Sequence, residues 1–245
     1  MIVDILSLIP PVFDNVFDES ILGAAKKGGL IEIRIHNFRD FGEGNHKTVD
    51  DSPFGGGPGM VLKANPLVSS LRKVRMEGMP APVIGLTPQG IPLKQELVKQ
   101  LARYPRIVLV CGRYEGFDDR ILSEFDLEIS VGDYVISGGE FAAMTLVDAI
   151  SRMIPGTVGR QESVEQASFY DGVLDHPQYT RPAIWEGHGI PPVLQAGNHA
   201  HIDRWRRGQA LVRTALRRPD LFAQASMTSD DQKAFQSVIL ETSTS

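Results

Sequence analysis

With 245 residues, of which 42% are hydrophobic and 22% charged, the chain is long enough for one large domain or two modest ones and has a typical globular composition. A net charge of −5 argues against wholesale nucleic-acid coating, and the single cysteine, Cys111, excludes an internal disulfide or a cysteine-based zinc cage. No apolar run approaches the roughly 18 residues of a membrane span and the N-terminus lacks a basic signal region, so we expect a cytoplasmic protein with no membrane partner.

The first 36 residues predict a β-α-β unit. Residues 1–9 are rich in Ile, Val and Leu, and residues 30–36 alternate isoleucine with charged side chains, which is typical of strands. Between them, residues 21–27 read as a helix that is closed by Gly28 and Gly29.

The next segments continue the alternation of helices and strands. Asn65 and Pro66 resemble the N-cap and first residue of a helix, and the apolar runs 83–86 and 107–111 suit buried parallel strands. A helix over residues 140–153 is apolar on nearly every side, so a layered core or a subunit interface should enclose it. We therefore predict an α/β domain over residues 1–157.

The alternation of predicted strands and helices then ends, and the rest of the sequence predicts a small helical domain. Residues 158–172 show no sustained period and are interpreted as a linker, which leaves residues 173–245 as the second domain. Asn198 should cap a helix, and Thr228 with Asp231 should cap a final one that ends near Leu240. The first of these helices has an apolar stripe made of Ile202, Trp205, Val212 and Leu216.

Several nucleotide and metal motifs are absent. The glycine run at residues 54–60 lacks the Lys-Ser/Thr pair of a P-loop, no strand-to-helix junction carries G-x-G-x-x-G, and no H-E-x-x-H occurs. Cys111 at a strand end is interpreted as a small buried apolar side chain rather than a nucleophile.

Three loops remain as a candidate ligand site, at residues 86–90, 111–116 and 131–140. Each is dense in glycine and in aromatic or polar residues, and each follows or adjoins an apolar segment. Ligands of α/β proteins collect at such strand ends, and glycines let the backbone approach a flat ring closely. The loops therefore predict one composite small-molecule pocket, although spacing alone does not name the ligand.

Taken together, these loops closely resemble the bacterial tRNA (guanine-N1)-methyltransferases of the TrmD type, within the SPOUT superfamily. The resemblance also covers residues 1–6, 49–60, 151–156, 179–182, 191–194, 197–200 and 204–206. It implies a SPOUT-type parallel sheet with a deep trefoil knot, a homodimer with its active site at the subunit interface, tRNA as partner and S-adenosylmethionine as methyl donor.

By position in the motifs, the resemblance implies a defined set of cofactor-binding residues in the three loops. They are Leu86, Thr87, Pro88, Gly90, Gly112, Tyr114, Glu115, Gly116, Val131, Gly132, Asp133, Tyr134, Val135, Ile136, Gly138 and Gly139.

The implied reaction moves the sulfonium methyl to N1 of the guanine immediately 3′ of the tRNA anticodon. That nitrogen carries a proton, so transfer needs both in-line placement and a proton acceptor. Negative charge then spreads onto O6, where the resemblance implies that Arg152 stabilises it. An ordinary i, i+4 pair between Arg152 and Asp148 is the alternative.

The sequence departs from the resemblance at the proton acceptor. The family's aspartate, aligned without gaps from Arg152, falls on Ala167, whose methyl group cannot accept a proton. Three explanations stay open. A neighbouring carboxylate substitutes, Glu165 first and then Glu162 or Asp171; or the chain binds both ligands with impaired catalysis; or solvent or a different residue is the base.

Substrate contacts follow from charge and from the resemblance. Arg204, Arg207 and Arg218 form a predicted basic face for tRNA phosphates. Asp50 and the glycine run, with Gly57 and Gly59, resemble a flexible rim for the flipped target base. Dependence on Mg²⁺ is suggested by the resemblance, but no carboxylate cluster in the sequence names a metal site.

Overall fold

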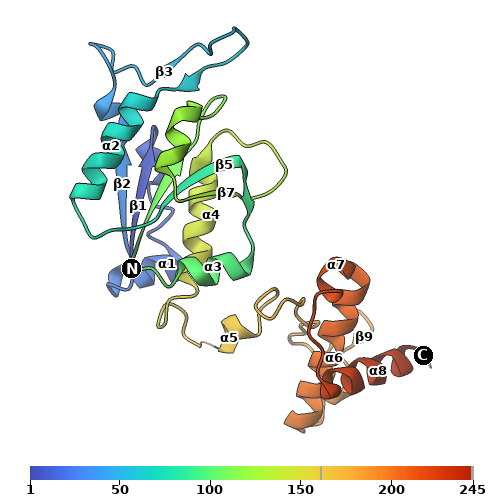
Figure 1. Cartoon of the computed structure of the whole chain (residues 1–245). Coiled ribbons are helices and arrows are strands. Elements are labelled where there is room, and N and C mark those ends of the chain that lie inside the picture. Colours follow the sequence, from blue (N-terminus) through green and yellow to red (C-terminus); the bar gives the residue numbers. More distant parts are fainter. Residues whose placement is uncertain (161, 244–245) are drawn as a thin grey trace. The chain divides into compact units, whose positions relative to one another are not determined.

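The computed structural model describes residues 1–160 and 162–243, and the chain divides into two compact units, residues 1–161 and 162–245 (Figure 1). The first unit contains a five-stranded parallel sheet in the order β2-β1-β6-β5-β7. Its strands are β1 (Ile2–Ser7), β2 (Glu32–Asn37), β5 (Val83–Pro92), β6 (Arg106–Cys111) and β7 (Leu127–Ser130). The α/β class with a central parallel sheet is therefore confirmed.

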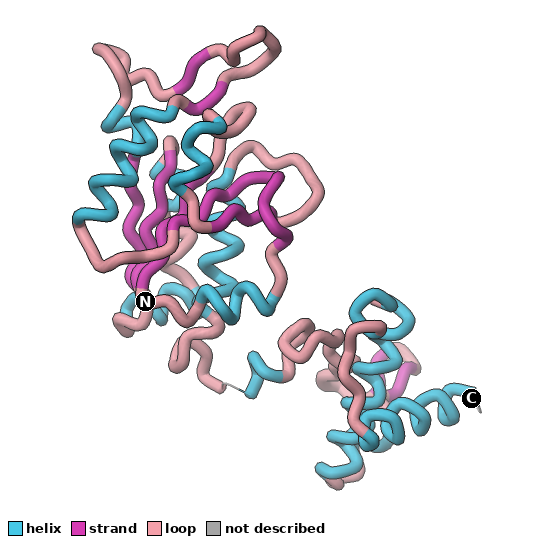
Figure 2. The backbone as a smooth tube through the Cα atoms, viewed as in Figure 1, coloured by secondary structure: helices cyan, strands magenta, loops and turns pink. Residues whose placement is uncertain are grey.

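Helices cover both faces of this sheet, as the cyan helices around the magenta strands show in Figure 2. They are α1 (Ser20–Lys27), α2 (Ala64–Met76), α3 (Gln95–Leu101) and α4 (Gly139–Ser151). Alternate residues of β6 face opposite ways: Leu109 lies in a core cluster with α4, whereas Val108 and Val110 lie in a second cluster with α2. A parallel sheet buried on both faces explains why its strands read as unbroken apolar runs.

The predicted β-α-β unit and the enclosed helix are confirmed. Gly28 caps α1, and Gly29 follows with a φ of 70°, a left-handed conformation that glycine adopts without strain. Helix α4 is largely buried, but Phe141, Thr145 and Asp148 are exposed.

Two predicted boundaries are wrong. Helix α2 begins at Ala64 with Lys63 as its N-cap, ahead of the expected cap at Asn65. The first glycine loop, residues 86–90, belongs to β5, which continues to Pro92 through a register shift in which Leu86 and Ile91 both pair with Ile129. Sequence periodicity cannot reveal a strand that leaves its neighbour for four residues and then pairs with it again.

A buried polar network ties the start of β6 to β1 and α2. Arg106 is 1% exposed and donates to Asp4 Oδ2 at 2.7 Å and to the carbonyl oxygens of Val74 and Met79. His36 Nε2 lies 2.7 Å from the other Asp4 oxygen. Burial by itself would raise the pKa of the Asp4 carboxyl, but its hydrogen bonds with His36 and Arg106 and their charges hold that pKa below its ordinary value.

The second unit is mainly helical. Its elements are α5 (Glu162–Glu165), β8 (Ile184–Trp185), β9 (His188–Gly189), α6 (His199–Arg217), α7 (Pro219–Phe222) and α8 (Ser229–Ser243). Helices α6 and α8 pack closely at Gly208, where an added Cβ would lie 2.5 Å from the Ala234 carbonyl oxygen. Residues 158–172, the expected linker, include α5 and the buried Val164.

Both predicted caps of this unit are confirmed. The Asn198 side chain accepts from the backbone N–H of His201, and Thr228 and Asp231 bond each other's backbone N–H groups as a capping box. The predicted apolar stripe of α6 is partly wrong, because Leu216 is 78% exposed, whereas Leu211 and Thr214 are buried. The face that packs on α8 and on the Leu174 backbone decides which residues are covered.

Small 3₁₀ turns and a short hairpin complete the fold. The turns are Pro10–Phe13, Phe38–Phe41, Asp119–Glu124 and Pro192–Gln195, and the hairpin joins β3 (Asp50–Asp51) to β4 (Val61–Leu62). Across residues 1–160 and 162–243, no helix has the length and apolarity needed to cross a bilayer.

We expect Arg106→Met to lower the free energy of unfolding by about 3–5 kcal/mol, because the Asp4 carboxylate would stay buried without its cation. Urea denaturation of the variant and the parent chain measures the difference. The exposed Arg103 supplies the control, since Arg103→Met should change stability by no more than about 0.5 kcal/mol. Equal effects of the two substitutions would contradict a stabilising role for the buried pair.

Candidate functional site

Three glycine-rich segments meet at the carboxyl edge of the parallel sheet. Leu86 of β5 is paired with Cys111 of β6 on one side and with Ile129 of β7 on the other. The three segments that follow these residues therefore leave the sheet side by side. The backbone N–H of Gly139 donates to the Gly112 carbonyl oxygen at 2.7 Å. We call residues 86–90, 112–116 and 131–139 the glycine junction.

Glycine is required where these segments touch. An added Cβ on Gly139 would lie 2.7 Å from the Gly112 nitrogen and 2.8 Å from Cys111 Cα, both of them backbone atoms that cannot move aside. An added Cβ on Gly112 would lie 2.9 Å from the Leu86 carbonyl oxygen. The absence of side chains therefore lets three chain segments approach within backbone contact of one another.

A fully buried carboxylate lies beneath the junction and was not singled out from the sequence. Glu140, at the start of α4, is 0% exposed; it accepts from Ser7 Oγ at 2.7 Å and from Arg113 Nε at 3.1 Å. These contacts join the end of β1, the segment after β6 and the first turn of α4. The sequence does carry one sign of this buried position, because Glu140 is a charged residue that follows two glycines and begins an otherwise apolar helix.

Cys111 lies under the same junction and is 0% exposed, which confirms its interpretation as a buried apolar side chain. Burial raises the pKa of its thiol well above the ordinary value, and the Glu140 charge raises it further, against a smaller opposing effect of Arg113. The thiol therefore stays protonated at neutral pH and is a poor nucleophile.

The junction leaves backbone and several large side chains accessible. Tyr114 is 50% exposed, Tyr134 is 62% exposed and Val135 is 99% exposed. Of the other predicted cofactor residues, Pro88, Glu115, Asp133 and Ile136 are exposed, Thr87, Gly90, Gly112, Gly116, Val131, Gly132 and Gly138 are intermediate, and Leu86 and Gly139 are buried. The accessible rings and free backbone groups suit a flat organic ligand.

The predicted substrate rim is attached to the second segment of the junction. Asp50 pairs with Leu62 in the β3–β4 hairpin, whose loop includes Gly57 and Gly59. The Glu115 N–H donates to the Met60 carbonyl oxygen, and the Leu62 N–H donates to that of Gly116. Gly59 has a φ of 81°, a left-handed conformation that glycine adopts without strain, and its Cα lies against the Glu115 side chain. A ligand that moves the second segment would therefore act on the rim.

Arg152 is the C-cap of α4 and is partly buried. Its backbone N–H reaches the Asp148 carbonyl oxygen at 3.3 Å, but its guanidinium forms no ion pair with Asp148 or with any other residue that the structure describes. The alternative of a structural side-chain pair is therefore not observed.

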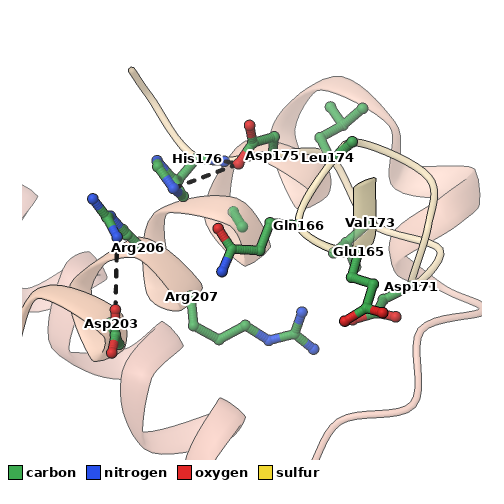
Figure 3. Close-up of a pocket in the computed structure, with 12 residues that line it drawn as sticks. Glu165, Gln166, Asp171, Val173, Leu174, Asp175, His176, Asp203, Arg206 and Arg207 are labelled. Carbon is green, nitrogen blue, oxygen red and sulfur yellow. Dashed lines mark hydrogen bonds and ion pairs between the residues drawn. The ribbon is translucent and has the colours of Figure 1, made fainter. Parts of the chain in front are cut away.

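The second unit has a cavity of about 250 Å³, drawn in Figure 3, whose lining includes Ala167. The residues that line it are Glu165, Gln166, Ala167, Asp171, Val173, Leu174, Asp175, His176, Asp203, Arg206, Arg207 and Ala210. Two of the alternative proton acceptors, Glu165 and Asp171, thus share one cavity with the position of the missing aspartate. The side chain of the third, Glu162, lies outside the described residues.

The predicted basic face of α6 is only partly available. Arg204 is exposed, whereas Arg207 Nε donates to Asp231 Oδ1 at 2.7 Å and Arg218 pairs with Asp220. Within the described part of the chain, no group of three or more His, Cys, Asp or Glu residues could hold a metal ion.

These features describe an α/β protein with a glycine-rich candidate site at the carboxyl edge of a parallel sheet, followed by a helical unit. Residues 1–224 match the family described as tRNA (Guanine-1)-methyltransferase TrmD, and the chain belongs to that family. Among its relatives is a tRNA (guanine-N(1)-)-methyltransferase from Syntrophotalea carbinolica, 50% identical over 96% of this chain and 96% of its own length.

Proteins with the same name give similar matches in two other organisms. The one from Dehalococcoides mccartyi is 47% identical over 100% of this chain and 99% of its own length. The one from Pasteurella multocida is 46% identical over 98% of this chain and 99% of its own length.

We expect Gly139→Ala to lower the free energy of unfolding by about 1–3 kcal/mol, because the new methyl group would force the Gly112 and Cys111 backbone apart. Thermal unfolding of the purified variant measures the loss. Gly159→Ala is the matched control, since an added Cβ there meets nothing within 4 Å. Equal melting temperatures for the two variants would contradict the close approach.

Proposed function

We propose that this protein is an S-adenosylmethionine-dependent tRNA methyltransferase that methylates N1 of the guanine immediately 3′ of the anticodon. Membership of the TrmD family and the names of its relatives support the reaction class. The observation that carries the assignment of the site is the junction of three glycine-rich segments held by the Gly139–Gly112 hydrogen bond.

The glycine junction is the proposed binding site for the methyl donor. Exposed rings of Tyr114 and Tyr134 can pack on an adenine, and the accessible backbone of the glycines can bond its edge. S-adenosylmethionine, when bound, supplies a methyl group carried by a sulfonium sulfur. The hydrogen bond between partly exposed Arg113 and buried Glu140 joins the second segment to the start of α4, which reduces the ordering required when the ligand binds.

Two groups of the chain must act on the guanine. As the N1 proton leaves, negative charge develops on O6, and the guanidinium of Arg152 is proposed to stabilise it. Its lack of an ion pair among the described residues supports this role. Glu165 is the proposed proton acceptor in place of the family's aspartate, because it lines the same cavity as Ala167.

The remaining features of the resemblance extend this proposal. Exposed Tyr134, Val135, Ile136 and Phe141 form apolar surface at the junction and on α4, which supports a homodimer with its active site at the subunit interface. A deep trefoil knot is proposed for the segments around the junction, supported by the return of the chain from β7 to Gly112 before α4 begins. Asp50 and the glycine rim are proposed to hold the target base. Arg204 and Arg207 are proposed to bind tRNA phosphates. Dependence on Mg²⁺ stays a prediction.

We expect the chain to transfer labelled methyl groups to unmodified bacterial tRNA and not to the same tRNA with adenine at the target position. In single-turnover assays, Ala167→Asp should raise the rate by about 10²-fold or more, because it places a carboxylate where the resemblance requires one. Ala167→Asn has the same shape without the base and should leave the rate unchanged. Absence of transfer by both the parent chain and Ala167→Asp would refute the proposed function.

We expect Glu165→Gln to slow methyl transfer by about tenfold or more in the parent chain, because the variant removes the proposed proton acceptor. In the Ala167→Asp background the same substitution should matter much less, since a second carboxylate is present. Glu96→Gln, at an exposed position of α3, is the control. A rate for Glu165→Gln equal to that of the control would exclude Glu165 as the base.

A further inference from the structure

A single cationic residue belongs to the glycine junction, and a buried carboxylate holds it there. Arg113 is the only Lys, Arg or His in residues 86–90, 112–116 and 131–139. Its Nε–H donates to Glu140 Oε2 at 3.1 Å, and Glu140, which is 0% exposed, also accepts from Ser7 Oγ. Because the carboxylate is itself fixed by burial and by Ser7, the guanidinium that bonds to it has a restricted orientation.

The hydrogen bond to Glu140 leaves the two terminal nitrogens of the guanidinium accessible to a ligand. In the part of the chain that the structure describes, Nη1 and Nη2 of Arg113 have no hydrogen-bond partner. Among the same residues, the buried polar side-chain atoms without a partner are Thr157 Oγ1 and Arg206 Nε alone, so the Nη atoms of Arg113 are not buried. The whole side chain is 19% exposed. Two accessible donors on one planar group match the two oxygens of a carboxylate.

The guanidinium lies against the third segment of the junction. A Cβ added to Gly138 would lie 2.7 Å from Arg113 Nε and 3.0 Å from its Cζ, so the missing side chain of Gly138 makes room for the guanidinium. Gly138 directly precedes Gly139, whose N–H bonds the Gly112 carbonyl oxygen. Arg113 is therefore held at the point where the second and third segments meet.

The charges of the junction are complementary to those of the proposed methyl donor. Besides Arg113, the junction carries two carboxylates, Glu115 and Asp133, and both residues are exposed. S-adenosylmethionine has the opposite set, which is one carboxylate together with an ammonium and a sulfonium group. An RNA phosphate suits the junction less well, because the two exposed carboxylates would repel it. The carboxylate at the amino-acid end of the donor is therefore the group that matches Arg113.

We propose that Arg113 is a specificity-determining residue of the donor site, whose terminal nitrogens bind the carboxylate of S-adenosylmethionine, and that Glu140 is the positioning residue that orients it. The assignment rests on the proposed function and lies entirely within the first unit. It gives a role to a buried carboxylate that the transfer of the methyl group does not use, and it adds a residue that sequence patterns did not single out.

Calorimetry with two ligands that differ by one group tests this assignment. S-adenosylmethionine and its decarboxylated form are titrated separately into the protein without RNA, so that no methyl transfer occurs. We expect the parent chain to bind the decarboxylated form about tenfold more weakly, the effect of one charge-assisted contact. Arg113→Gln should bind S-adenosylmethionine about tenfold more weakly, should bind the decarboxylated form as the parent chain does, and should no longer distinguish the two ligands.

Matched variants separate this contact from general charge and from stability. Arg72→Gln removes an exposed positive charge from α2, outside the junction, and should keep the full discrimination between the two ligands. Arg113→Lys retains the charge without the pair of terminal nitrogens, so it should discriminate less than the parent chain. Both affinities are measured on the same preparation, so partial unfolding of a variant changes the stoichiometry of binding and not the ratio of the affinities.

The two partners of Glu140 provide the test of its positioning role. Glu140→Gln removes the charge that orients the guanidinium and should reduce the discrimination between the two ligands. Ser7→Ala removes the hydrogen bond to the other carboxylate oxygen, so it should lower the melting temperature and keep the discrimination. Equal effects of the two variants on the ratio of the affinities would refute the positioning role.

The proposal is overturned if the parent chain binds the two ligands equally, or if both Arg113 variants discriminate as the parent chain does. Fluorescence anisotropy with an anticodon stem-loop tests the other occupant: weaker RNA binding by Arg113→Gln, with an unchanged ratio of the two ligand affinities, would assign the guanidinium to an RNA phosphate instead.

Methyl transfer is measured separately, so that failure of this proposal and failure of the proposed function are distinct. Transfer with equal binding of the two ligands would refute the role of Arg113 alone. Discrimination without transfer, also after Ala167→Asp, would refute the proposed reaction and leave the donor contact intact. Absence of any binding of S-adenosylmethionine to the parent chain would refute both.

Discussion

The hydrogen bond from Gly139 to Gly112 is the contact on which the arrangement of the first unit depends. It fixes the start of α4 against the end of β6, and no residue with a Cβ fits at Gly139. Because α4 starts there, Glu140 enters the core beside Ser7 and Arg113. A buried carboxylate is stable only with such partners, so the close backbone contact and the polar network support each other.

The two units use different chemistry at their sites. The glycine junction offers mainly backbone groups and exposed rings, which suits a ligand recognised by shape and by its hydrogen-bonding edge. The cavity around Ala167 is lined largely by polar and charged side chains, among them Glu165, Asp171 and Arg206. In the proposed reaction, the glycine junction binds the methyl donor and Glu165 of the cavity accepts the N1 proton.

Ala167 makes this chain informative about proton transfer. General-base assistance commonly contributes about 10²–10⁴-fold, so a methyl group at this position leaves the proton to a neighbouring carboxylate, to solvent or another residue, or slows the reaction. Glu165 and Asp171 line the same cavity, and either carboxylate could serve as the base.

The sequence by itself determined the class of the fold, the parallel strands and the helix ends at Gly29, Asn198 and Thr228, because hydrophobic period and capping residues act locally. The loops at residues 86–90, 111–116 and 131–140 could be named as candidates from their local composition, because glycine and aromatic residues are visible in the sequence. Only the tertiary structure decided that β5 pairs again at Ile91, that Leu216 is exposed, and that Glu140 is buried against Ser7 and Arg113. Those outcomes depend on contacts between residues far apart in the chain, and such contacts leave no periodic trace in the sequence.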